Sequence, residues 1–142
     1  MPWTTRGRAL ALRSVFGADK SSIAPATLYL ALFKGDPAGS GTEPTSTGSY
    51  ARVAKTNDAT LWGTIGATDT AISNVGTSGA ITWPAASAVW SITDPLTHWA
   101  IFDNSSGGNM LASGTLSTPI TITGAGDQAR IPAGAFTITQ EA

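Results

Sequence analysis

The sequence contains no cysteine, which excludes disulfide bonds, thiolate metal sites and a cysteine nucleophile. Charged residues make up only 12% of the chain, about half of the roughly 25% that a soluble domain carries. Because the formal net charge is -1, the whole surface does not attract polyanions, and we expect no nucleic-acid partner. The longest apolar run, Leu28 to Phe33, is far shorter than the roughly 20 residues of a membrane helix, so we expect no membrane partner.

Side chains with catalytic chemistry are also scarce. His98 is the single histidine, and it stands between Thr97 and Trp99 in an apolar strand pattern without a Gly-x-Ser-x-Gly motif in the chain. The acidic residues are scattered, and each lies in or beside a predicted turn, where carboxylates cap backbone groups. We therefore expect no enzyme activity, no metal and no cofactor. A small hydrolase built on His98 is the alternative from the enzyme class.

Small and hydroxyl-bearing residues (Thr, Ser, Ala and Gly) take the place of the missing charges. A monomeric domain depends on mixed charges for its solubility, whereas the centres of protein interfaces are depleted in charge. The composition therefore favours a structural protein that packs against copies of itself or against another protein.

Half of the positive charge lies in a short amino-terminal arm, residues 1–20. Leu12, Val15 and Phe16 stand at helical spacing, a threonine at position 4 or 5 suits the start of a helix, and Gly17 suits its end. We predict a basic helical arm over residues 1–20, followed by a second domain over residues 21–142. The residues of the arm expected to bind a partner or a neighbouring subunit are Arg6, Arg8, Arg13, Leu12 and Phe16.

From residue 27 onward the pattern is that of short strands. Their spacing of about 8–12 residues predicts an all-β fold, an antiparallel, jelly-roll-like β-sandwich that follows the helical arm. The Gly- and Pro-rich residues 34–49 predict a long loop, and residues 104–109 predict a hairpin connection. The predicted strands cover residues 27–33, 50–55, 61–65, 80–83, 88–93, 98–103, 110–116, 119–123 and 135–139.

Five tryptophans are more than a chain of this length needs. Trp90 and Trp99 lie within apolar strand patterns and are predicted to be in the core. Trp62 and Trp83 stand at strand ends, beside a glycine and a proline. They are our candidates for exposed ligand-binding or interface aromatics, although burial in the core or in an interface is favoured over a platform for sugars.

Several segments, taken in order, resemble a group of small virion proteins of tailed bacteriophages, the head-fibre, capsid-decoration and tail-fibre proteins. These segments are APATLYLALF (24–33), GSYAR (48–52), ITWPAA (81–86), THWAIFD (97–103), GNML (108–111) and IPAGAFTIT (131–139). The resemblance implies a non-enzymatic β-sandwich, made in the host cytoplasm, that forms a homotrimer on the surface of the phage particle.

The role that the resemblance implies first is capsid decoration, in which a cement protein binds the assembled shell as an oligomer. Its partners would be its own copies and the major capsid protein, with the arginines of the arm as the anchor. The alternative is a tail-fibre or tail-tip component, which would bind tail proteins and a host-surface ligand. That ligand would be held by Trp62 or Trp83 and the long loops.

Overall fold

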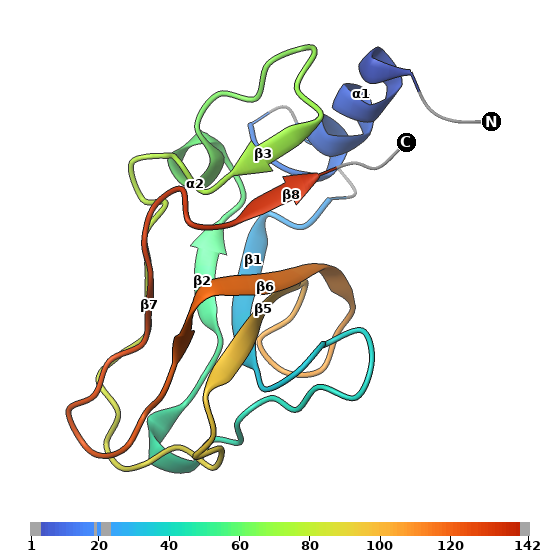
Figure 1. The fold of residues 1–142 in the computed structure, drawn as a ribbon. Coiled ribbons are helices and arrows are strands. Elements are labelled where there is room, and N and C mark those ends of the chain that lie inside the picture. Colours follow the sequence, from blue (N-terminus) through green and yellow to red (C-terminus); the bar gives the residue numbers. More distant parts are fainter. Residues whose placement is uncertain (1–3, 19, 21–23, 140–142) are drawn as a thin grey trace.

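A computed structural model describes residues 4–18, 20 and 24–139 of the chain (Figure 1). Two short α-helices, one 3-10 turn and eight strands follow one another along these residues. In chain order they are α1 (Thr5–Val15), β1 (Thr27–Phe33), η1 (Thr47–Ser49), β2 (Val53–Thr56), α2 (Ala59–Trp62), β3 (Ala71–Ser73), β4 (Ile81–Thr82), β5 (Leu96–Phe102), β6 (Met110–Ile120), β7 (Arg130–Ile131) and β8 (Thr137–Thr139). Neither described helix is long and apolar enough to cross a membrane.

The main sheet is antiparallel, with the strand order β2-β1-β5-β6. Its inner strand β1 is apolar on both faces, because Leu28, Leu30 and Leu32 pack in the main core and Ala31 and Phe33 pack in a second cluster. Leu30 pairs with Ile101 and Leu32 with Trp99, which aligns the large side chains of β1 and β5 on one face. The prediction of an antiparallel β fold is therefore confirmed.

Two small strand pairs, β3-β8 and β4-β7, complete the β structure. Their buried residues Ile72, Ile81 and Ile131 belong to the same hydrophobic core as the leucines of β1. The core is thus enclosed between the main sheet and these two pairs (Figure 1). The jelly-roll order of the strands stays a prediction.

A chain of aromatic contacts runs through the core and joins distant parts of the sequence. The ring of Phe16 lies 5.1 Å from that of Trp62, measured between centroids. Trp62 lies 6.0 Å from Phe136, and Phe136 lies 4.4 Å from Trp99. Large aromatic side chains contribute strongly to core stability, because each buries a large apolar area. The contacts connect α1, α2, the end of the chain and the main sheet.

Four sequence predictions of strands were wrong or incomplete. Residues 61–65 were expected to form a strand, but α2 ends at Trp62, because Asp58 caps it and Gly63 stops it at a φ of 71°. Residues 88–93 form no strand, and the two strands expected over 110–116 and 119–123 are largely a single one, β6. The short strands β3 and β7 were not foreseen. Each of them is defined by a partner strand far away in the sequence.

The helical arm is confirmed as a helix, and it packs on the body of the protein. Leu12 and Phe16 belong to the same core cluster as the leucines of β1. The predicted boundary between residues 20 and 21 falls beside residues 19 and 21–23, which lie outside the described part of the chain.

Candidate functional site

The basic arm is the first candidate surface, and the structure divides its residues into two groups. Leu12 and Phe16 are 3% and 5% exposed and pack inside the protein's own core, so the expectation that they bind a partner is corrected. The backbone of Arg6 and Arg8 lies in α1, and their side chains are outside the described structure. Arg13 is half-buried and lines a hollow beside α2.

One buried amide holds the arm to the body. The side-chain oxygen of Asn57 accepts hydrogen bonds from the backbone N–H of Gly17 (2.9 Å) and from the indole N–H of Trp62 (3.0 Å). Its amide nitrogen donates to the carbonyl oxygens of Val15 (2.7 Å) and Pro25 (2.9 Å). Asn57 is 0% exposed, and all four hydrogen bonds available to its side chain are made. We call this arrangement the Asn57 anchor.

Gly17, at the end of the arm, fits the Asn57 anchor because it has no side chain. Its φ of 88° lies in the left-handed region that favours glycine. A Cβ atom built on it would stand 2.7 Å from the Cδ1 atom of Ile65. The sequence prediction that Gly17 ends the helix is therefore confirmed, and the same residue brings the arm within hydrogen-bond distance of Asn57.

Trp62 and Trp83 are not exposed ligand-binding aromatics, which corrects that prediction. Trp62 is 2% exposed, and its indole N–H is used by the Asn57 anchor. Trp83 is 0% exposed, and within the described structure its indole nitrogen has no hydrogen-bond partner. Both rings are held in the core, so neither presents a face to a sugar.

At the other end of the molecule, an arginine joins the two predicted loops. The Nε and Nη2 atoms of Arg52 donate to the two carboxylate oxygens of Glu43, at 2.9 and 2.8 Å. Its Nη1 atom donates to the carbonyl oxygens of Asn104 (2.9 Å) and Gly107 (2.8 Å). The guanidinium also lies over the ring of Phe102, 3.7 Å from its centroid. We call this the Arg52 clamp, because it connects the loop over residues 34–49 to the hairpin over residues 104–109.

Tyr50 extends the Arg52 clamp into the main sheet. Its hydroxyl donates to Glu43 at 2.8 Å and accepts a hydrogen bond from the backbone N–H of Leu32 at 3.2 Å. Burial, together with the negative charge of Glu43, raises the pKa of Tyr50 far above its usual value, so the phenol stays neutral. Beside the clamp lies a cleft of about 420 Å³, lined mainly by Ser, Thr and Gly from the two loops together with Glu43 and Arg52.

Three aspartates, Asp58, Asp103 and Asp127, bond to groups of their own turns. Asp103 accepts hydrogen bonds from the backbone N–H (2.7 Å) and the side-chain amide (3.0 Å) of Asn109. These bonds lower the pKa of Asp103, and similar bonds from Thr60 and Thr123 lower those of Asp58 and Asp127. Within the described residues, His, Asp and Glu side chains do not gather in threes as a metal site would require. The Nδ1 atom of His98 lies 2.8 Å from the hydroxyl of the adjacent Thr97.

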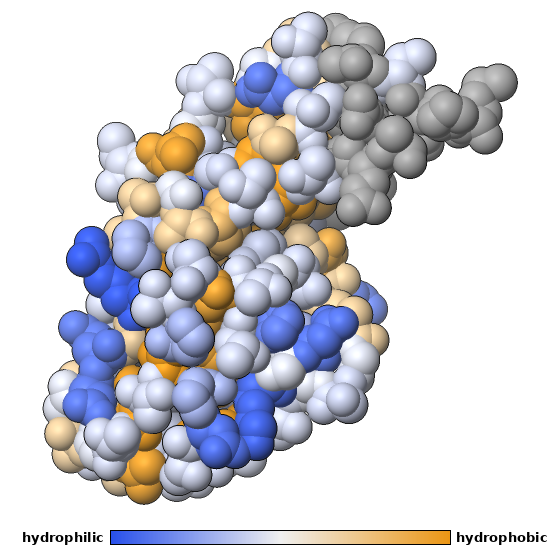
Figure 2. Space-filling model, in the orientation of Figure 1, coloured by the Kyte–Doolittle hydropathy of each residue, from blue (hydrophilic) through white to orange (hydrophobic). Residues whose placement is uncertain are grey.

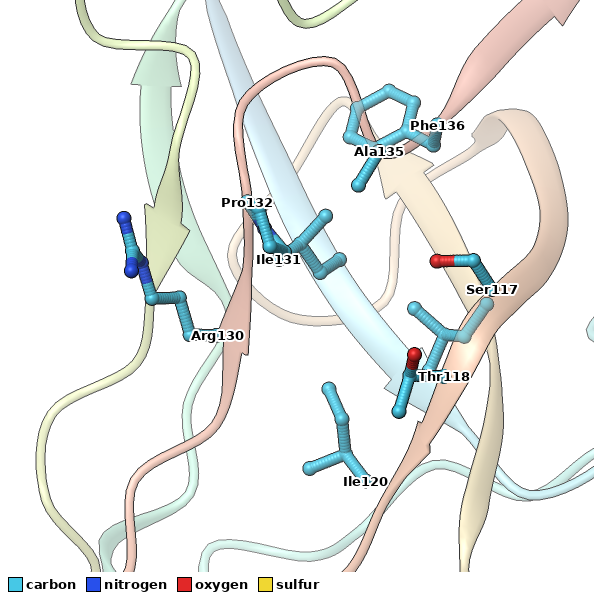
Figure 3. A pocket seen from close by; sticks show the side chains of 9 residues that line it. Ser117, Thr118, Ile120, Arg130, Ile131, Pro132, Ala135 and Phe136 are labelled. Atoms are coloured by element: carbon cyan, nitrogen blue, oxygen red, sulfur yellow. The ribbon is translucent and has the colours of Figure 1, made fainter.

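An apolar hollow of about 270 Å³ lies between β6 and β7. Figure 3 shows Ile120 and Ile131 directed into this space, with Phe136 above them and Ser117 and Thr118 along β6. Figure 2 shows a face on which pale, weakly polar side chains dominate and strongly hydrophilic ones form separate patches. Such a surface agrees with the low charge content of the sequence.

Sequence reasoning missed Asn57, Glu43 and Arg52, the residues that organise both ends. Asparagine and paired charges are common in loops, and most of their partners here are far away in the sequence: Arg52 lies nine positions from Glu43, and Asn57 lies 40 positions from Gly17. One signal was available: Arg52 and Lys55 interrupt the apolar alternation of a predicted strand. Charges at such positions require partners or solvent.

The model of the family described as Gp80, podophage GP4 fiber I protein gp80, matches residues 8–139. No curated protein matches the chain.

Proposed function

This chain belongs to the podophage GP4 fiber I protein gp80 family and is a phage fibre protein; we propose that it is a non-enzymatic subunit that binds the assembled capsid shell as a decoration or head-fibre protein. The family match supports a structural fibre role, and attachment to the shell is the part that we propose. The resemblance to head-fibre, decoration and tail-fibre proteins found in the sequence is confirmed by the same match.

The arrangement of the two ends supports an attached, outward-pointing subunit. Figure 1 shows α1 at one end of the molecule and η1, within the long loop, at the other. The Asn57 anchor fixes the first end, and the Arg52 clamp fixes the second. We propose that the α1 end faces the particle, with Arg6 and Arg8 as contacts to acidic groups on the shell. The loop end then points outward.

Self-association is part of the proposal. A chain with 12% charged residues has the uncharged surface that subunit interfaces use. The resemblance implies a homotrimer, and sedimentation of the purified protein gives the number of copies.

A tail-fibre component that binds a host-surface ligand is the second candidate. The observation that favours it is the cleft of about 420 Å³ at the loop end, where hydroxyl groups stand beside Glu43 and Arg52. Such a lining offers both donors and acceptors to a polar ligand.

Cryo-electron microscopy of purified virions, with copy numbers from stained gels, separates the two candidates. We expect many copies at regular sites on the shell. A few copies at the tail would replace decoration with the tail-fibre candidate, and absence from the particle would contradict both.

Rebinding to particles that lack the protein tests the proposed contacts. We expect Arg8→Glu to lose most of its occupancy on the shell, because it reverses a charge of the arm. Arg130→Glu, which reverses an exposed charge on β7, is the matched control and should bind as the unchanged protein does. Equal binding of the two variants would contradict an electrostatic anchor at the arm.

A further inference from the structure

The two outer edges of the main sheet differ in how they are protected. Proteins commonly guard an outer strand by making it short or by placing charged residues, especially lysine, on it. The edge strand β2 has both features: it is four residues long and contains Lys55. The ammonium group of Lys55 donates to the carbonyl oxygens of Ser78 and Ala80, each at 2.9 Å, so it stays at this edge.

The opposite edge strand, β6, is eleven residues long and contains no charged side chain. It pairs with β5 on one side, and no described strand pairs with its other side. A hollow of about 490 Å³ follows this free side at Leu111–Ser113, between β6, β8 and α1. The apolar hollow of Figure 3 follows it at Leu116–Ile120. Hollows therefore lie beside β6 along much of its length.

Both ends of β6 carry features that discourage pairing. Its register with β5 is interrupted between Met110 and Ala112 and again between Thr115 and Ile120, and Pro119 has no N–H to donate. From Ala112 to Thr115 the pairing with β5 is regular, which keeps this part of the strand extended and straight. A Cβ atom on Gly114 would stand 2.7 Å from the ring of Trp99, so this position faces the core, and Ser113 belongs to the opposite face.

We propose that the free edge of β6 over residues 112–115 binds a second copy of this chain, with the two β6 strands antiparallel to each other. The backbone of an unpaired edge selects another strand as its occupant, because only a strand satisfies a row of alternating donors and acceptors. The absence of charged side chains on β6 favours another β6 as that strand. Pairing β6 with itself brings no like charges together, whereas pairing β2 with itself places lysine near lysine.

This inference rests on the self-association in the proposed function and adds the surface that mediates it. A contact between two β6 strands is isologous, so the same residues of both copies meet across a twofold axis. It therefore predicts a dimer, in place of the trimer that the resemblance implies.

Charge substitutions at Ser113 test the inference, because a twofold axis within residues 112–115 brings the two copies of this residue close together. We expect Ser113→Lys and Ser113→Glu each to weaken dimer formation by at least about tenfold, because like charges meet. An equimolar mixture of the two variants should restore the dimer. The measurement is sedimentation equilibrium, with circular dichroism and the urea midpoint of each variant to verify folding.

The matched control is Thr56→Lys, which places a lysine on an exposed position of the guarded edge strand β2. It should dimerise as the unchanged chain does. If the unchanged chain and the Ser113 variants associate equally well, the β6 contact is overturned, while the proposal of self-association stands. If the unchanged chain is a monomer over the whole concentration range, the β6 contact and the proposed self-association are both overturned. The position of the protein in the virion is decided separately by microscopy.

Discussion

The two ends of the molecule are each held by one side chain, and the two side chains are chemically opposite. At the α1 end, the neutral amide of Asn57 is 0% exposed. At the loop end, the side chain of the charged Arg52 is 7% exposed and that of its partner Glu43 is 21% exposed. A neutral amide loses little when it is desolvated with every hydrogen bond made, whereas a guanidinium needs a carboxylate beside it.

The difference between these two side chains shows which part of a protein suits each kind of connection. The Asn57 anchor joins the end of α1 to the start of β1 inside the core, where an unpaired charge is very costly. The Arg52 clamp joins two surface loops, where its planar fork bonds a carboxylate and two carbonyl groups at once. We therefore expect the first to be insensitive to salt and the second to weaken as salt rises.

Removal of the Asn57 anchor should have the largest effect on stability. Asn57→Ala leaves Gly17 and Trp62 with unsatisfied donors and Val15 and Pro25 with unsatisfied acceptors. We expect it to lower the free energy of unfolding by about 4 kcal/mol, measured by urea denaturation. The exposed Asn104→Ala is the control and should cost less than about 0.5 kcal/mol. A loss below about 1 kcal/mol for Asn57→Ala would contradict the anchor.

Removal of the Arg52 clamp should have a smaller and more local effect. Arg52→Ala leaves Glu43 without its cation and frees both loops, so we expect a loss of about 2–3 kcal/mol. Hydrogen–deuterium exchange should become faster at residues 34–49 and 104–109 and stay unchanged in α1.

Arg52→Lys keeps the positive charge but not the fork, and it should restore less than half of the lost stability. Full restoration by lysine would show that charge alone holds the loops. Uniformly faster exchange over the whole chain would show that the clamp is not local.

Lowering the pH should have the smallest effect on stability, and it should act near both the Asn57 anchor and the Arg52 clamp. Asp58 caps α2 beside the Asn57 anchor, and Asp103 holds the hairpin beside the Arg52 clamp; hydrogen bonds lower the pKa of both below 3.8. A lowered pKa in the folded state stabilises the protein above the unfolded value, and that contribution is lost as pH falls through the folded pKa.

The urea concentration at the unfolding midpoint should therefore decrease as the pH is lowered from about 5 to about 2. This decrease should be less steep in Asp58→Asn and in Asp103→Asn, because each variant lacks one titrating group. The same slope in all three proteins would mean that other groups determine the acid response.

The parts of the fold that the sequence predicted are those with local causes. Strand β1 was predicted at its observed bounds, because a run of apolar residues ends in a Gly- and Pro-rich loop. The helix of the arm was predicted from its apolar stripe and from Gly17. The hairpin at residues 104–109 followed from residues that accept a positive φ, and Gly107 and Gly108 have φ values of 60° and 74°.

The parts that were missed depend on contacts between distant residues. Leu61 and Trp62 resemble a strand in the sequence, but a cap from Asp58 makes them helical, and Asn57 then binds the indole. Strand β3 has three residues and exists through its pairing with β8. Apart from the Trp62 indole, five positions from Asn57, the groups that bond to these two organising side chains lie 9 to 55 positions away, a separation that no local pattern encodes.

The Asn57 anchor also determines how the protein carries mechanical force. A pull on α1 reaches the carbonyl of Val15 and the N–H of Gly17, and both are bonded to one side chain at the start of the segment that leads into α2. From there the force passes to Pro25, two residues before β1, and so toward the central strand of the main sheet. Asn57 therefore links the end of α1 to the sheet by hydrogen bonds as well as through the chain, so the α1 end resists tension together with the sheet.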